Sequence, residues 1–343
     1  MIKCVVWDID NTLLDGVFLE SAADSPRPDA ELVAAARELS GRGILQALAS
    51  RNPPAAADYV REVTGLDFAA TECGWGSKVA AIERIAAELA IGTDALAFVD
   101  DDMLERAEVA AALPDVLVLT PEDAAEAADW PQFSPAVITA EARQRGQMYA
   151  ARRRRQAEAM TFGGSRAEFL RHAGTRITIG PATVADVPRL HELSVRTHQL
   201  NSAGEPLSEA ELTGLVSSAG HLVVVVTLAD NYGDDGLVGA AIMERNGAGP
   251  WFVPVVMMSC RALGRGALDA LLAWLCRCAA DAGGNQLHVP CLVTERNVPM
   301  RLALAAAGLR AEPAAVAPDG RAVFTRSLTG QLPVLPAFVT DRQ

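Results

Sequence analysis

The chain carries two aspartates, spaced one residue apart, directly after an apolar run: residues 5–12 read VVWDIDNT. The apolar run predicts a buried strand, and open α/β sheets bind their ligands at the carboxyl ends of such strands. Side chains alternate along an extended chain, so Asp8 and Asp10 are expected to point to the same side. One carboxylate of such a pair can attack a phosphorus and help to hold Mg²⁺, while the other passes a proton to the leaving oxygen. Two buried charges would be costly in a strand with only a structural role.

Three further sets of polar residues each follow a predicted strand or open a predicted helix. Ser50, Arg51 and Asn52 offer a hydroxyl and backbone amides to a phosphate oxygen. Lys78 can neutralise both Asp8 and a transferring phosphoryl group, and residues 100–102 supply three aspartates, whose oxygens suit Mg²⁺. Taken alone, the three sets could be an ordinary loop, a surface lysine and a helix N-cap. Because they occur together and in this order, we interpret them as one site for phosphoryl transfer.

The elements that position these residues change character along the chain. In the first part, strands alternate with helical stretches, which predicts a doubly wound parallel sheet; the strands are Cys4–Trp7, Ile44–Ala49, Ala97–Val99 and Val116–Leu119, and the helices are Ala30–Ser40, Ala55–Thr64 and Ser77–Leu89. In the second part, β-branched strands surround a long amphipathic helix, which predicts an α+β layer structure; the strands are Ile177–Ile179, Leu222–Leu228, Leu237–Glu244, Trp251–Met258 and Gln286–Val289, and the helices are Ala185–Thr197, Ala267–Ala282 and Pro299–Ala307.

We therefore predict an α/β protein with a Rossmann-like parallel-sheet domain over residues 1–135, a helical connector over 136–175 and an α+β domain over 176–332. The connector contains four consecutive arginines, Arg152–Arg155, which predict a solvated helix face or, alternatively, a landing site for an acidic partner. The short segment between Leu14 and the next predicted helix leaves no room for a large insertion. We therefore expect the first site to be open to a bulky substrate.

A second candidate site lies in the predicted α+β domain, at the turn between the third strand and the long helix. Arg261, Gly264 and Gly266 place backbone amides at a helix N-terminus, an arrangement that binds phosphate or pyrophosphate. Cys260 directly precedes this turn and stands beside an arginine, so its thiol could carry an acyl group as a thioester. Alternatively, Cys260 and each of the other cysteines could be a small residue buried in the core.

Polar residues also gather at the end of the first helix of this domain, where residues 196–201 read RTHQLN. Arg196, Gln199 and Asn201, together with Asp230, could line an acyl or pantetheine pocket. His198 could belong to this pocket or, alternatively, be a surface residue.

Composition narrows the possible partners of the chain. Its 343 residues are half hydrophobic and carry a net charge of −13. This charge disfavours nucleic acid and means that an acidic protein partner would need a local basic patch. No apolar run is long enough to span a membrane, no signal peptide is read, and the six cysteines are irregularly spaced, so we expect a cytoplasmic protein without a disulfide framework.

The motifs together resemble the FkbH family of polyketide pathways. The resemblance rests on VVWDIDNTLLDGV, GILQALASRN, GWGSK, LAFVDDDMLERAEV, RTHQLN, MMSCRALGRG and TERNVPM, in this order along nearly the whole chain. Members of this family look like a phosphatase domain of the haloacid dehalogenase-like (HAD) superfamily joined to a GNAT-like acyltransferase domain. The resemblance implies that 1,3-bisphosphoglycerate loads a glyceryl unit on a cysteine, with loss of phosphate, and that the unit passes to the phosphopantetheine thiol of an acyl carrier protein.

The resemblance also implies roles for individual residues. At the first site, Asp8 is the expected nucleophile, Asp10 the general acid/base and Lys78 the phosphate-neutralising lysine. The expected phosphate and substrate contacts are Thr12, Ser50, Arg51, Asn52, Arg196, Gln199 and Asn201. Mg²⁺ is expected at Asp8, Asp100 and Asp101, with Asp10 as a ligand through its backbone carbonyl. At the second site, Cys260 is the expected acyl carrier, and Arg261, Gly264 and Gly266 bind pantetheine.

Two other functions remain open at this stage. The chain could be an Mg²⁺-dependent HAD phosphatase joined to an acetyl-CoA-dependent N-acetyltransferase. It could also be a catalytically silent module that docks a carrier protein, although the intact acidic and lysine residues of the first site argue against this.

Overall fold

The computed structural model of the chain describes all residues except 21–25, 135–138, 140–142, 296, 318 and 343. The chain forms two compact units, Met1–Arg153 and Arg154–Gln343. The boundary falls within helix α7 (Arg145–Thr161), so the predicted connector over 136–175 is divided between the two units. No described helix is long and apolar enough to cross a membrane.

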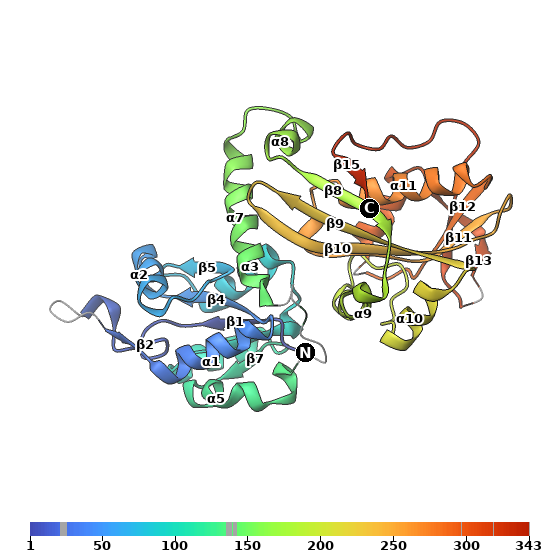
Figure 1. Cartoon of the computed structure of the whole chain (residues 1–343). Coiled ribbons are helices and arrows are strands. Elements are labelled where there is room, and N and C mark those ends of the chain that lie inside the picture. Colours follow the sequence, from blue (N-terminus) through green and yellow to red (C-terminus); the bar gives the residue numbers. More distant parts are fainter. Residues whose placement is uncertain (21–25, 135–138, 140–142, 296, 318, 343) are drawn as a thin grey trace. The chain divides into compact units, whose positions relative to one another are not determined.

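The first unit is built on a parallel sheet with the strand order β5-β4-β1-β6-β7 (Figure 1). The strands are β1 (Cys4–Trp7), β4 (Leu45–Ser50), β5 (Ala70–Cys73), β6 (Leu96–Val99) and β7 (Leu117–Leu119). A short antiparallel pair, β2 (Leu14–Asp15) and β3 (Arg27–Pro28), follows β1 in the chain. The chain proceeds from β1 to one edge of the sheet and then returns to β6 on the other side of β1. Such a reversal opens a ligand crevice at the carboxyl ends of the central strands.

Helices cover both faces of this sheet. They are α1 (Ala30–Gly41), α2 (Pro54–Thr64), α3 (Lys78–Leu89), α4 (Met103–Ala112) and α5 (Pro121–Glu126). Helices α1, α2 and α5 pack with Val5 and Trp7 on one face, and α3 and α4 pack with Val6 on the other, as the alternation of side chains along β1 requires. The Ser77 side chain accepts a hydrogen bond from the amide of Val79 and so fixes the start of α3 at Lys78.

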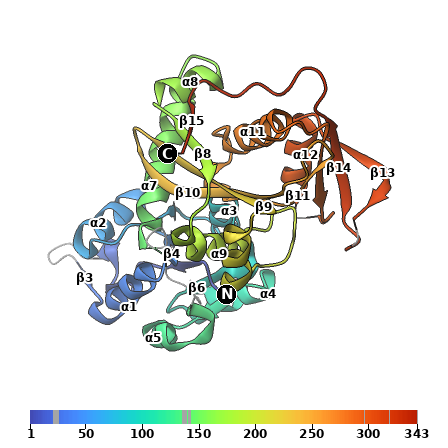
Figure 2. The same ribbon diagram turned by 45° about the vertical axis from the view of Figure 1, so that its right-hand side comes forward.

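The second unit is a mixed sheet with helices on both faces (Figure 2). Its strand order is β13-β14-β12-β11-β10-β9-β8-β15. The strands are β8 (Arg176–Pro181), β9 (His221–Asp230), β10 (Gly233–Glu244), β11 (Trp251–Met258), β12 (Gln286–Cys291), β13 (Arg310–Val316), β14 (Ala322–Ser327) and β15 (Val339–Asp341). The helices are α8 (Arg166–His172), α9 (Val187–Arg196), α10 (Glu209–Ser217), α11 (Ala267–Asp281) and α12 (Val298–Ala306).

The cores of the second unit follow the alternation of its strands. Val225 and Val255 face helices α9 and α10, whereas their neighbours Val224 and Val256 face α11 and α12. The predicted fold class, a Rossmann-like parallel-sheet domain followed by an α+β domain, is therefore confirmed. Several elements were not predicted: β5 and α4 in the first unit, and α10, β13, β14 and β15 in the second.

The β9–β10 hairpin is tighter than predicted. Strand β10 begins at Gly233, not at Leu237, because only Asn231 and Tyr232 form the turn. Irregular register between Asp234 and Gly239 accommodates the longer strand.

Candidate functional site

Three of the predicted first-site residues stand at the ends of three adjacent strands. Asp8 follows β1, Ser50 ends β4 and Asp100 follows β6. Strand β1 pairs in parallel with β4 on one side and with β6 on the other, so these carboxyl ends lie at the same edge of the sheet. The sheet topology thus brings a hydroxyl and two carboxylates to the edge of the sheet where the strand order reverses, a common place for ligands in such sheets.

Lys78 joins the two carboxylates. Its Nζ atom lies 2.5 Å from Asp8 Oδ1 and 2.9 Å from Asp100 Oδ2. All three residues are at least nine-tenths buried. The first residue of α3 therefore supplies one positive charge between two buried negative charges. A buried ion pair depends on such geometry to compensate for its lost hydration.

The surroundings shift the pKa values of these groups. Burial raises the pKa of Asp8 to about 6, and the Asp100 carboxylate adds to this, while Lys78 partly offsets it. Burial would lower the pKa of Lys78, but Asp8 and Asp100 outweigh burial and hold the pKa above its ordinary value. Lys78 is therefore the charged partner of the site, and the pair of carboxylates carries excess negative charge that a cation can relieve.

A carboxylate cluster suitable for a cation lies after the carboxyl ends of β1 and β6. Asp8, Asp100 and Asp101 each offer an oxygen, and these oxygens lie within 4.8 Å of one another. Burial, followed by the charge of Asp100, raises the pKa of Asp101. An oxygen-only donor set of three closely spaced carboxylates fits Mg²⁺ and does not favour a thiophilic metal.

Asp10 has a separate environment. Its Oδ1 atom accepts a hydrogen bond from the amide of Phe18 at 2.9 Å, and its Oδ2 atom accepts one from Asn52 Nδ2 at 2.9 Å. The alternation argument does not extend to this residue, because β1 ends at Trp7 and the chain turns. Asn52 also donates to Ser50 Oγ at 3.1 Å, so this amide connects Ser50 to Asp10.

The other predicted phosphate contacts are placed at the border of this cluster. Arg51 is half exposed and forms an ion pair at 2.7 Å with Glu105 of α4, a residue that the sequence did not single out. Thr12 is buried, and its hydroxyl has no hydrogen-bond partner in the part of the chain that the structure describes.

A pocket opens beside Lys78, lined among others by Ser50, Cys73, Ser77 and Arg84. The turn after β5 is fixed there by a 3.0 Å hydrogen bond from the amide of Gly74 to the carbonyl of Ser50. Burial raises the pKa of the Cys73 thiol to about 11, so this cysteine is a neutral thiol at neutral pH.

In the second unit, the structure brings the RTHQLN segment against the strand that leads to Cys260. The amide of Met258 donates to the carbonyl of Leu200 at 2.8 Å, and the amide of Ser202 donates to the carbonyl of Val256 at 2.9 Å. The carbonyl of Ser202 accepts from the amide of Leu292 at 2.9 Å. Three segments that lie far apart in the sequence, at residues 200–202, 256–258 and 292, thus meet at the ends of β11 and β12.

These contacts have a geometric reason. Strand β11 pairs with β12 at only two positions, at Trp251 and Phe252. Residues 200–202 bond to β11 and to the residue after β12 where direct pairing has stopped, so they satisfy backbone groups that would otherwise be unpaired.

The predicted substrate contacts of this segment differ in their placement. Asn201 is buried and uses its side chain locally: Nδ2 donates to the carbonyl of Thr197, and Oδ1 accepts from the amide of Ala203. Asn201 therefore holds its own loop. Arg196 is half buried and Gln199 is exposed.

The predicted thiol loop has the expected position between β11 and α11. Cys260 is half buried and opens the short 3₁₀ helix Cys260–Ala262. Gly264 and Gly266 have φ values of 79° and 76°, in the left-handed region that favours glycine, and Gly266 caps α11. Arg261 is buried, and its Nε lies 3.3 Å from Ser259 Oγ.

Burial distinguishes Cys260 from most other cysteines. Cys4, Cys276 and Cys291 are fully buried, and burial raises their thiol pKa values, to about 11 for Cys276 and Cys291. These three fit the alternative of small core residues.

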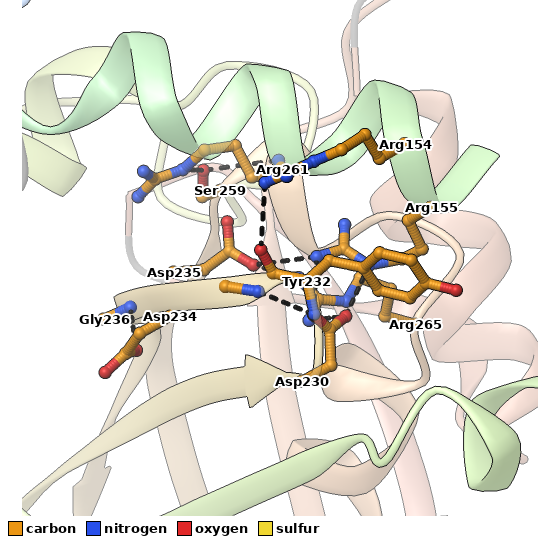
Figure 3. Close-up of polar contacts among 11 residues, drawn as sticks. Arg154, Arg155, Asp230, Tyr232, Asp234, Asp235, Gly236, Ser259, Arg261 and Arg265 are labelled. Carbon is orange, nitrogen blue, oxygen red and sulfur yellow. Dashed lines mark hydrogen bonds and ion pairs between the residues drawn. The ribbon is translucent and has the colours of Figure 1, made fainter. Parts of the chain in front are cut away.

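Two expectations for charged residues are corrected (Figure 3). Arg155 does not belong to a solvated face: its side chain is 7% exposed and pairs with Asp230, with Nη2 3.0 Å from Oδ1. Asp230 in turn is not a free wall of a pocket, because Arg265 also binds it at 2.7 Å. The aspartates that pair with Arg155 are distant in sequence, so the run of four arginines alone did not predict these ion pairs.

Comparisons with known proteins give matches to solved structures only; no family model and no curated protein matches the chain. The N-terminal part of a Bacteroides fragilis protein containing a phosphatase domain, complexed with Mg, is 29% identical, covers 37% of this chain and 38% of that chain, and has a TM-score of 0.34. The 3-deoxy-D-manno-octulosonate 8-phosphate phosphatase of Moraxella catarrhalis, with magnesium ion, is 21% identical over 32% of this chain and 64% of that chain, with a TM-score of 0.28.

Acetyltransferase structures match as well. The ribosomal-protein-S18-alanine N-acetyltransferase of Escherichia coli is 16% identical, covers 45% of this chain and 96% of that chain, and has a TM-score of 0.32. The solved structures that the chain matches thus include phosphatases and acetyltransferases.

Proposed function

We propose that the first unit is an Mg²⁺-dependent phosphohydrolase of the HAD type. The observation that carries the proposal is the buried Asp8–Lys78–Asp100 cluster, with Asp101 beside it, at the strand reversal. Mg²⁺ held by Asp8, Asp100 and Asp101 would neutralise charge on the transferring group. Lys78 adds a fixed positive charge at the same place. Neutralising the negative charge of the transferring group is the main requirement of phosphoryl transfer.

The side chains divide the reaction into two displacements. Asp8 attacks the phosphorus, the bond from phosphorus to the leaving oxygen breaks, and the protonated Asp10 gives its proton to that oxygen. A water molecule then attacks the phosphorylated Asp8, Asp10 takes the proton of the water, and inorganic phosphate leaves. Asn52 and the amide of Phe18 hold the Asp10 carboxylate in one orientation for both steps.

Mg²⁺ is expected to stabilise the first unit against heat. A cation that binds only the folded protein at a concentration 100 times its Kd adds about 2.7 kcal/mol, which is a shift of several degrees for a unit of this size. Thermal unfolding with Mg²⁺ and with EDTA measures the shift. Asp100→Asn should abolish it.

A neighbouring aspartate provides the matched control for this measurement. Asp102 caps α4 through the amide of Leu104, and asparagine caps equally well, so Asp102→Asn should keep the Mg²⁺ shift. Equal shifts in the Asp100→Asn and wild-type proteins would contradict the proposed metal site.

We infer further that the whole chain is a glyceryltransferase/phosphatase acting with an acyl carrier protein. The inference rests on the resemblance of the motif strings and on the contact of Leu200, in RTHQLN, with Met258, which lies two residues before Cys260. The Cys260 thiolate attacks the carbonyl of the acyl phosphate of 1,3-bisphosphoglycerate, and the bond from carbon to the phosphate oxygen breaks. The thiolate of the carrier phosphopantetheine then takes the acyl group and releases Cys260. The remaining phosphomonoester is a substrate for the first unit.

Intact-mass measurement tests this function. The protein incubated with 1,3-bisphosphoglycerate should gain a glyceryl-sized or phosphoglyceryl-sized increment, and the increment should move to an added carrier protein that bears phosphopantetheine. A parallel incubation with acetyl-CoA and an amine tests the N-acetyltransferase alternative. Acetyl turnover without any three-carbon adduct would replace the glyceryltransferase proposal.

A further inference from the structure

A cluster of buried charges in the second unit is not used by the reactions described above (Figure 3). It consists of Arg155, Asp230, Asp235 and Arg265, whose side chains are at most 7% exposed. Arg265 binds both carboxylates: Nη2 lies 2.7 Å from Asp230 Oδ2, and Nη1 contacts Asp235. Arg155 contacts the same two aspartates, so two positive and two negative charges balance within the cluster.

Asp230 also fixes the hairpin that carries these carboxylates. Its Oδ1 atom accepts hydrogen bonds from the amides of Tyr232 at 2.9 Å and Gly233 at 3.2 Å. The ring of Tyr232 lies 5.6 Å from the Arg155 guanidinium. One carboxylate thus joins the turn of the β9–β10 hairpin to two arginines from other elements.

General stability is a weak explanation for this arrangement. Removing four charged groups from water is costly, and well-packed apolar side chains of similar volume are often as stabilising. Directional ion pairs do, however, specify one geometry. The position of the cluster shows which segment of the chain these ion pairs hold in one geometry.

Arg265 stands between Gly264 and Gly266, both in the left-handed region. Glycine gives a loop many accessible conformations, and Arg265 has the only side chain between these two residues. Its ion pairs therefore restrain the turn before α11, as does the hydrogen bond from Arg166 Nε to the carbonyl of Gly264 at 2.8 Å.

The loop is held at its other end as well. The amide of Ser259 donates to the carbonyl of Val238 on β10 at 2.7 Å, three residues beyond Asp235. Between these points, the amide of Leu263 bonds to the carbonyl of Cys260 at 3.1 Å. Cys260 therefore belongs to a segment that is attached to β10 at both ends.

We propose that Arg265, together with Asp230 and Asp235, positions the loop of residues 259–266 and, through it, the Cys260 thiol for acyl transfer. This inference rests on the proposed function, because it takes Cys260 as the acyl carrier. Arg265 is a positioning residue in this account: it acts through the loop and does not contact the acyl group.

The test compares Arg265→Met, Arg265→Lys and Asp235→Asn in the full chain. The rate of alkylation of Cys260 by iodoacetamide is measured by peptide mass spectrometry, with Cys73 of the first unit as the internal reference. In Arg265→Met, alkylation should rise at least about threefold because the loop opens more often, while the rate of glyceryl transfer falls roughly 10- to 100-fold. Arg265→Lys should be intermediate, since lysine keeps the charge but not the two-carboxylate contact.

Two controls separate positioning from general damage. Phosphate release from p-nitrophenyl phosphate reports the first unit and should be unchanged. Asp186→Asn removes another ion pair of the second unit, with Arg342 at 2.9 and 3.0 Å, and should leave the alkylation rate of Cys260 unchanged. Asp235→Asn preserves side-chain size and the Arg265–Asp230 pair, so it serves if Arg265→Met fails to fold.

Failure of the positioning role can be distinguished from failure of the proposed function. Wild-type rates of alkylation and transfer in Arg265→Met and Asp235→Asn overturn the positioning role, as does an equal change in Asp186→Asn. If the wild-type protein forms no acyl adduct on Cys260, the proposed function fails, and the alkylation rates alone still decide whether Arg265 controls the loop.

Discussion

Asp8→Asn should reduce phosphate release from a phosphomonoester by at least about 10³-fold. Asparagine keeps the shape of the side chain but cannot form the phosphorylated intermediate. In this variant, among the ion pairs of the described residues, Asp100 is the one carboxylate that still pairs with Lys78. Steady-state release of inorganic phosphate measures the loss, and circular dichroism checks that the variant is folded.

The same variant also reveals the order of the two reactions. If Asp8 acts only in phosphate removal, Asp8→Asn should still load Cys260, and the increment should remain phosphoglyceryl-sized. Asp102→Asn is the control because Asp102 is exposed and caps α4. Phosphate release within tenfold of the wild-type rate in Asp8→Asn would refute the nucleophile assignment.

Cys260→Ala should lose the three-carbon adduct and lower transfer to the carrier protein by at least about 10³-fold, because no other thiol is expected to form the thioester. Phosphate release by the first unit should be retained. Intact mass and peptide mapping after incubation with 1,3-bisphosphoglycerate give the adduct and its position.

Two cysteines serve as comparisons for this variant. Cys278 is a half-buried thiol of α11, and its substitution by alanine should leave the adduct in place. Cys73 lines the pocket beside Lys78, so it is the most informative competitor. An adduct that survives in Cys260→Ala and disappears in Cys73→Ala would move the acyl chemistry to the first unit.

The fold was predictable where sequence patterns are local and strong. Strands β1 and β11 have the predicted bounds because each is an unbroken apolar run. Strand β5 was missed because Ala70–Cys73 is short and contains Thr71 and Glu72, and it lies at an edge of its sheet. Strand β15 has only three residues, so it carries no pattern that a sequence could reveal.

The candidate site shows the same division. The meeting of Asp8 and Asp100 follows from one rule, that parallel strands end at a common edge of the sheet, and Lys78 joins them from the start of α3. The pairing of Arg155 with Asp230 follows from no such rule, because the two residues are 75 positions apart and a run of arginines is usually solvated. The side chain of Asn201 bonds to local backbone groups, a use that the sequence does not separate from ligand binding, so its predicted contact with substrate stays a prediction.

The pairing of β15 with β8 has a consequence for how the protein is made. Thr178 and Thr340 are neighbours across these strands although 162 residues separate them. All the strands of the parallel sheet, in contrast, lie within residues 4–119. During synthesis the first sheet can therefore assemble while the ribosome is still translating the second unit, whose edge at β8 has to wait for residues 339–341. Until then β8 presents an unpaired edge, through which nascent chains can pair with one another.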